Sequence, residues 1–87
     1  MPQTITKGVK ALLAEANSLV ETMAVEEAKQ KVLDENYVFI DLRDIRELQR
    51  SGMIPGAFSC PRGMLEFWID PDSPYHKPVF NQDKTYV

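Results

Sequence analysis

The feature that most constrains the fold is an unbroken run of strand-forming residues in the middle of the chain, from Tyr37 to Leu42. Asp41 is the single polar residue in this run, and the apolar residues do not alternate with polar ones. A strand with this pattern is covered on both faces, as the strands of parallel sheets are. The sequence therefore predicts an α/β fold in which residues 37–42 form the central strand.

Helix and strand signals alternate after this strand. Asp44 is the predicted N-cap of a short helix whose buried side would carry Ile45 and Leu48, and Gly52 is its predicted left-handed stop. A turn then leads to a second short buried strand at 57–60. This order is typical of a βαβ unit with parallel strands.

The last part of the sequence predicts a third strand. Residues 63–69 form a short apolar helix in this interpretation, residues 70–77 form a loop rich in Pro and Asp, and residues 84–87 begin a strand. A strand in that position leaves a sheet edge and a hydrophobic face uncovered. We therefore expect residues 1–87 to be a single domain that is truncated at its C-terminal side and completed by more polypeptide or by a second chain.

Two helices are predicted before the central strand. Apolar residues at helical spacing, with Thr6 as N-cap, predict an additional N-terminal helix over 6–20. The same spacing between Val25 and Leu33 predicts a second helix, with Asn36 as its stop. The N-terminal helix could pack back on the sheet or mediate association, and the sequence leaves this choice open.

Charge and composition exclude several classes of protein. A formal net charge of -3 with scattered basic residues gives no attraction for phosphates, so nucleic acid is not an expected partner. No stretch approaches the length of a membrane span and no signal-peptide pattern opens the chain, so the expected location is the cytoplasm. One cysteine and one histidine predict neither an internal disulfide nor a metal site.

Two motifs in the middle of the chain resemble the rhodanese family. Asp41-Leu42-Arg43-Asp44, followed by Glu47, matches the Asp-x-Arg with which a strand of that family ends and the glutamate of the helix that follows it. Gly52-Met53-Ile54-Pro55-Gly56-Ala57 matches the family's Gly-His-Ile-Pro-Gly-Ala turn, with Met53 in place of the histidine. The spacing fits without a gap, and the resemblance extends from about Val20 to Val87.

The resemblance implies a rhodanese-like fold, with a mostly parallel central sheet and helices on both faces, incomplete in this chain. It also implies a sulfurtransferase that takes sulfane sulfur from thiosulfate, a small anionic donor, and passes it to a thiophilic acceptor through a cysteine persulfide. The family's catalytic cysteine opens the loop after the strand that residues 85–87 begin, so no catalytic residue and no cofactor is assigned within this chain. The chain alone is therefore expected to be inactive.

Three charged residues are predicted to form the rim of the pocket. Asp41 and Arg43 follow the central strand, at the edge where open α/β sheets place their ligands, and Arg62 follows the next strand. For Arg43 we also predict a structural role, as a partner of Glu47 or of a backbone carbonyl, and for Asp41 a role in binding loop N–H groups. Arg62 is either an attractor of the anionic donor or a solvated residue.

Cys60 lies near Arg62 and is the one thiol that could replace the missing nucleophile. We predict instead that it is a small buried hydrophobe on the strand face of Phe58. Phosphatases of the Cys-x5-Arg type need an arginine six residues after the cysteine, and Glu66 occupies that position. The sequence therefore disfavours phosphatase chemistry at Cys60.

Two hypotheses from other classes remain beside the sulfurtransferase. The chain could be a non-catalytic binding module on a rhodanese-like scaffold, or it could associate with a second copy of itself and complete the sheet by exchanging strands.

Overall fold

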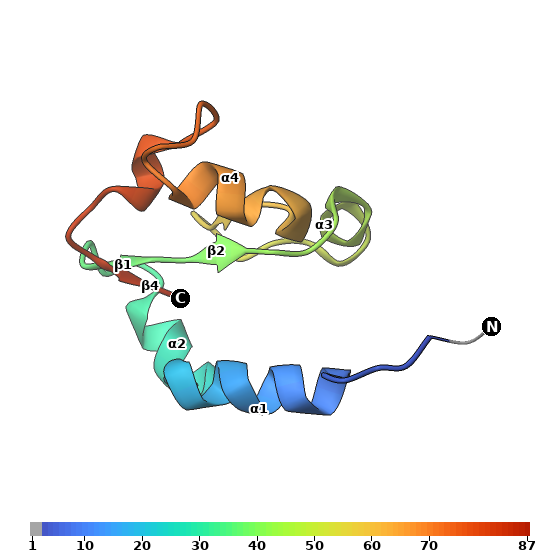
Figure 1. Ribbon diagram of the computed structural model, residues 1–87. Coiled ribbons are helices and arrows are strands. Elements are labelled where there is room, and N and C mark those ends of the chain that lie inside the picture. The colour runs from blue at the N-terminus through green and yellow to red at the C-terminus, as the bar shows by residue number, and fades with distance from the viewer. Residues whose placement is uncertain (1–2) are drawn as a thin grey trace.

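The computed structural model describes residues 3–87, which form a small parallel sheet with helices around it (Figure 1). In chain order the elements are helices α1 (Val9–Leu19) and α2 (Val25–Lys31), strands β1 (Tyr37–Val38) and β2 (Ile40–Asp41), helix α3 (Ile45–Ser51), strand β3 (Phe58–Ser59), the 3-10 helix η1 (Arg62–Met64), helix α4 (Leu65–Ile69), the 3-10 helix η2 (Pro78–Phe80) and strand β4 (Thr85–Tyr86).

The segment 37–41 is the middle strand of the sheet, as predicted. β1 and β2 are consecutive parts of it, and β2 pairs in parallel with β3 while β1 pairs in parallel with β4. The Phe58 amide donates to the Phe39 carbonyl at 2.8 Å, and the Ile40 amide donates to the Val87 carbonyl at 2.7 Å. Backbone hydrogen bonds therefore leave this segment on both sides, and the carboxyl ends of all its neighbours lie at one edge.

Helices lie on both sides of the strands in Figure 1, with α4 on one side and α1 and α2 on the other. Aromatic side chains hold α4 and the C-terminal part against the sheet. The Phe58 ring meets the ring of Trp68 in α4 at 5.9 Å and that of Phe80 in η2 at 6.0 Å, both edge to face. Phe80 in turn stacks on Tyr86 of β4 at 6.0 Å, so one aromatic cluster connects three elements.

The molecule is open for its size. Its accessible surface is 7394 Å², whereas a compact monomer of 9.9 kDa exposes about 5,200 Å². Its radius of gyration is 15.5 Å, compared with about 12 Å for a compact domain of this length. Among the described residues, the buried hydrophobic side chains are Phe39, Leu48 and Cys60. The fold is therefore partial, and much apolar surface lies uncovered.

The N-terminal helix is shorter than predicted. It spans Val9–Leu19 instead of 6–20, and its N-cap is Gly8, which has extended backbone angles and no capping side chain. The prediction of Thr6 as N-cap is therefore wrong, because the chain around Thr6 forms a bend instead of joining the helix. At the other end, Val20 is extended and ends the helix.

The second helix also ends before its predicted limit. It stops at Lys31, and Leu33, predicted to lie on its buried side, is 93% exposed. Local polar bonds explain the early stop: the Asp34 amide donates to the Lys31 carbonyl, and the Asp34 carboxylate accepts from the Asn36 amide at 2.9 Å. An Asx turn thus replaces the last helical turn.

Helix α3 begins and ends as predicted. The Asp44 carboxylate accepts from the Arg46 amide at 2.8 Å, and Gly52 ends the helix with a φ of 80°. Leu48 is buried at 7% exposure. Ile45, however, is 54% exposed, so its prediction as a buried residue is wrong. A helix of two turns presents one side chain to this small sheet, and Leu48 occupies that place.

Candidate functional site

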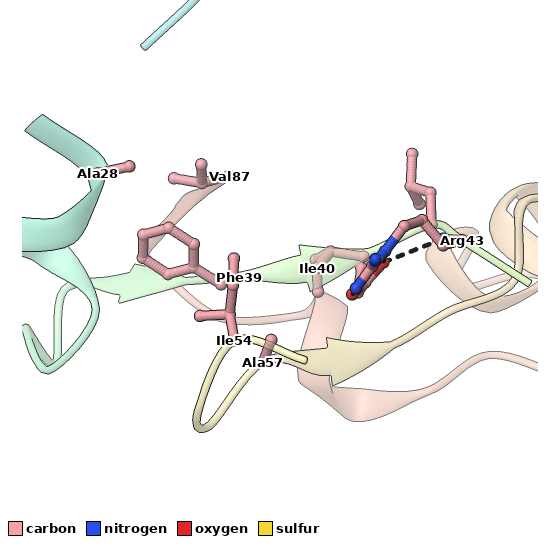
Figure 2. Close-up of a pocket in the computed structure, with 9 residues that line it drawn as sticks. Ala28, Phe39, Ile40, Arg43, Ile54, Ala57 and Val87 are labelled. Carbon is pink, nitrogen blue, oxygen red and sulfur yellow. Dashed lines mark hydrogen bonds and ion pairs between the residues drawn. The ribbon is translucent and has the colours of Figure 1, made fainter. Parts of the chain in front are cut away.

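A pocket of about 290 Å³ lies along the middle strand, between α2 and the turn before β3. It is lined by Ala28, Phe39, Ile40, Asp41, Leu42, Arg43, Ile54, Ala57 and Val87. Figure 2 shows Phe39 at one end, beside Ala28 and Val87, and Arg43 at the other. The pocket is therefore apolar along most of its length and charged at the carboxyl end of β2.

Asp41 and Arg43 form a fork-like ion pair at that charged end. The Arg43 Nη2 donates to Asp41 Oδ2 at 2.8 Å and its Nε donates to Asp41 Oδ1 at 3.0 Å. The Arg43 backbone amide also donates to Asp41 Oδ1, at 3.1 Å. Arg43 Nη2 then reaches the carbonyl of Gly52 at 3.0 Å. One guanidinium thus connects the end of β2 to the end of α3.

This arrangement corrects one part of the predicted pairing and supports the other. The carboxylate partner of Arg43 is Asp41, not Glu47, although the predicted contact with a backbone carbonyl is present at Gly52. Asp41 binds a loop N–H group, as predicted, through the amide of Arg43. Sequence spacing favoured Glu47 as an i,i+4 partner, but Arg43 precedes the helix, so that spacing does not apply to it.

The charges of this pair shift each other's protonation. The hydrogen bond from the Arg43 side chain lowers the pKa of Asp41, and the Asp41 carboxylate raises the pKa of Arg43. Asp41 is therefore an anion at neutral pH and accepts hydrogen bonds without donating any. A carboxylate in this state positions its arginine and is unsuited to act as a general acid.

Arg62 follows β3 and lies near the same edge of the sheet. Its amide donates to the Leu42 carbonyl at 3.2 Å, which places the start of η1 beside the carboxyl end of β2. Its guanidinium pairs with Glu66 at 2.7 Å, and both side chains are 64% exposed. Arg62 is not among the residues that line the pocket with Asp41 and Arg43. The structure thus brings two of the three predicted rim residues together, and Arg62 stands beside them on the next strand.

Cys60 has the character of a core residue. It is fully buried, at 0% exposure, and its amide donates to the Asp41 carbonyl at 2.9 Å. Burial raises the pKa of its thiol, and the negative charge of Glu66 acts in the same direction. A protonated, inaccessible thiol is neither a nucleophile nor a metal ligand. The sequence prediction of a small buried hydrophobe is confirmed.

Apolar residues account for what the sequence reasoning missed. Phe39 and Ile54 line the pocket with Ala57, and a second groove of about 580 Å³ is lined by apolar residues of β2, α4 and β4. Continuous apolarity in the middle strand signalled a covered face, but it gave no indication that the cover is incomplete. Within residues 3–87, no cluster of three His, Cys, Asp or Glu side chains could hold a metal ion.

The comparison with protein families decides the assignment. The family model of the rhodanese-like domain matches residues 24–87. The chain belongs to this family. The rhodanese-like part therefore includes the strands, the pocket and the Asp41–Arg43 pair, whereas α1 precedes it.

A solved structure agrees with this assignment. The chain is similar to a protein of unknown function from Rhodopseudomonas palustris CGA009, described as a possible tyrosine phosphatase, with 57% sequence identity and a TM-score of 0.91. The match covers 100% of this chain and 67% of the neighbour. No curated protein matches the chain. The rhodanese-like fold described above is thus shared with a longer polypeptide.

The described residues were also compared with the requirements of a membrane span. None of the helices between residues 3 and 87 has both the length and the apolar character needed to cross a bilayer.

Proposed function

We propose that this chain is the scaffold of a rhodanese-like sulfurtransferase, which moves sulfane sulfur from thiosulfate to a thiophilic acceptor. In this proposal the nucleophile is a cysteine in polypeptide that follows Val87. The observation that carries the proposal is the rhodanese-like match over residues 24–87, with its parallel strands ending at one edge beside Arg43 and Arg62. The longer solved neighbour, of which this chain covers 67%, supports a longer functional unit.

The proposed reaction has two balanced steps. A cysteine thiolate attacks the outer sulfur of thiosulfate, a new S–S bond forms, and sulfite leaves with the electron pair of the broken bond. The persulfide then gives its outer sulfur to an acceptor such as cyanide, and the thiolate is restored. Backbone N–H groups of a loop at the sheet edge lower the pKa of such a thiol and hold it as the anion.

The rim residues have separate roles in this proposal. Arg43 positions the edge of the site, since its guanidinium is already bound to Asp41 and to the Gly52 carbonyl. Arg62 attracts the anionic donor, because its side chain is exposed and its single carboxylate partner, Glu66, is exposed as well. An exposed pair of this kind costs little to open when a dianion arrives.

The test is transfer of sulfur from thiosulfate to cyanide, measured with residues 1–87 and with a longer polypeptide that continues beyond Val87. We expect turnover by the longer form and none by residues 1–87. Arg62→Gln in the longer form should raise the KM for thiosulfate, while Arg50→Gln on the exposed surface of α3 serves as the matched control. Turnover by residues 1–87 that Cys60→Ser abolishes would overturn the proposal and make Cys60 the nucleophile.

A second candidate function is phosphoester hydrolysis, which the description of the 57% identical neighbour as a possible tyrosine phosphatase favours. A thiolate surrounded by N–H groups suits a phosphoryl anion as well as thiosulfate. Cys60 does not supply it, because the thiol is buried and Glu66 stands where a Cys-x5-Arg enzyme has arginine. Hydrolysis of a phosphotyrosine peptide by the longer form, without sulfur transfer, would decide for this candidate.

The third reading, a non-catalytic rhodanese-like binding module, makes a simpler prediction. A cysteine shortly after the strand that includes Thr85 and Tyr86 is required for either chemistry and is not required for binding. Sequencing of the native protein beyond Val87 therefore separates the module from the two enzymes.

A further inference from the structure

Helix α1 is the element of this molecule that its own chain supports least. It contains no buried residue, and it precedes the rhodanese-like part, which begins at residue 24. In Figure 1 it lies on the outside, beyond α2 and on the side of the strands opposite α4. The solved neighbour matches over 100% of the chain, α1 included, so this placement belongs to a shared architecture.

An isolated helix with this sequence is not expected to be stable. It has 11 residues, and helices shorter than about 12–15 residues are marginal in water even when their sequence is favourable. Its N-cap is Gly8, without a capping side chain. Packing against another surface must therefore supply the stability that α1 needs.

The apolar residues of α1 form one stripe, and this stripe is uncovered. Its members recur at helical spacing and span about a third of the helix circumference. We call it the α1 stripe; it comprises Val9, Leu12, Leu13, Ala16, Leu19 and Val20. Val9 is 69% exposed, Leu13 58% and Leu19 80%, values that a lipophilic stripe on a finished surface does not show.

The charges at the ends of α1 are the reverse of those that stabilise a helix by itself. Lys7 and Lys10 lie at the N-terminal end and Glu21 lies just beyond the C-terminal end, so each charge opposes the helix dipole. Helix α2 follows the usual rule, with Glu26 and Glu27 in its first turn and lysines in its last. The charge order of α1 therefore suits a neighbouring helix that runs in the opposite direction.

We propose that α1 is a self-association helix, which pairs in antiparallel orientation with α1 of a second copy through the α1 stripe. With a two-fold axis beside Ala14, Val9 of one copy faces Leu19 of the other, and Leu12 faces Ala16. The same register brings the lysine end of each helix to the glutamate end of its neighbour. Apolar layers and opposite charges then match in a single arrangement.

The available surface is sufficient for such an interface. A standard interface buries about 800 Å² on each partner, and this molecule exposes about 2,200 Å² more than a compact monomer of its mass. The stripe is also separate from the strand edges and from the pocket. Pairing through α1 therefore leaves the proposed active edge of both copies open.

The first test is sedimentation of the wild-type protein and of two variants at about 100 µM, a concentration at which weak dimers are populated. We expect the wild type to be a dimer and Leu12→Glu to shift its dissociation constant by at least about tenfold, toward monomer. Ala14→Glu, on the opposite face of α1, is the matched control and should remain a dimer. A monomeric wild type, or equal association of all three proteins, would overturn the proposal.

A second measurement holds even where Leu12→Glu fails to fold. Val9→Cys and Leu19→Cys chains, distinguishable by mass, are mixed under mild oxidation; the native Cys60 is buried and does not compete. Antiparallel pairing predicts a disulfide between the two different variants and none within either alone. Cross-linking of each variant to itself would show a parallel pair instead, and cross-linking to neither would show that α1 covers another surface.

Discussion

At the scale of single residues, the two ionisable groups nearest the middle strand have opposite surroundings. Cys60 is enclosed by apolar side chains, and burial raises the pKa of its thiol. Asp41 has an arginine beside it, and the hydrogen bond from that side chain lowers the pKa of its carboxyl. Neighbouring positions on the same sheet thus hold one group neutral and the other charged.

The first prediction concerns the reactivity of Cys60. Iodoacetamide should leave the thiol unmodified in the folded protein and alkylate it fully in urea, because only the exposed thiolate reacts. Cys60→Ser should lower the free energy of unfolding by about 1–3 kcal/mol, since a hydroxyl would replace a thiol at an enclosed position. Mass spectrometry and urea denaturation measure these effects. Rapid alkylation of the native protein would contradict the buried assignment.

The second prediction concerns the Asp41–Arg43 pair and pH. The folded pKa of Asp41 lies below its ordinary value of 3.8, so the pair stabilises the fold above that pH. The contribution falls as the pH drops through the lowered folded pKa. Urea midpoints measured at neutral pH and below pH 4 should show this loss in the wild type.

The matched comparison for that experiment uses two substitutions. Arg43→Gln should lower the urea midpoint at neutral pH and flatten its dependence on acid, since Asp41 would lose its charged partner. Arg50→Gln, also at an arginine of this region, should retain the wild-type profile. Parallel profiles for Arg43→Gln and the wild type would argue against a stabilising role of the pair.

At the scale of elements, each helix of the described chain ends where local bonds favour another conformation. Helix α3 depends on Gly52 in particular, which combines a φ of 80° with a carbonyl that accepts from Arg43. A side chain at this position would meet no atom within 4 Å, so its cost would come from the backbone alone. The end of α3 and the charged end of the pocket therefore depend on the same residue.

The third prediction follows from this backbone requirement. Gly52→Ala should destabilise the protein by about 1–2 kcal/mol, because L residues with a side chain disfavour a positive φ. Gly63→Ala is the control: its site is equally open, and Gly63 is not among the glycines of positive φ. Urea denaturation of both variants gives the comparison. Equal stabilities would mean that the chain relaxes around residue 52 without cost.

The same local bonds explain how far the sequence could predict this structure. The middle strand, the capped start of α3 and the burial of Cys60 follow from patterns of a few adjacent residues, and the structure confirms them. The end of α2 was placed too late, because an Asx turn at Asp34 competes with helix. The partner of Arg43 was misassigned, since the choice between two nearby carboxylates depends on the path of the chain after β2.

At the scale of the whole molecule, order is concentrated in the sheet. The middle segment is bonded on both sides, and the aromatic cluster around Phe58 holds α4 and η2 against it. Helix α1 has no comparable support within its own chain. Local opening should therefore need the least free energy at α1 and the most at the strands.

The last prediction tests this gradient by amide hydrogen exchange at two protein concentrations. The amides of Ile40, Phe58 and Cys60 should exchange most slowly at both, because each donates a backbone bond within the sheet. The amides of α1 should exchange quickly in dilute solution and become protected as the concentration rises, since pairing through the α1 stripe orders the helix by mass action. The strand amides are the internal control, and Leu12→Glu should remove the concentration dependence from α1 alone. Equal protection of α1 at both concentrations, with sedimentation showing a monomer, would mean that contacts within one chain are enough to stabilise this helix.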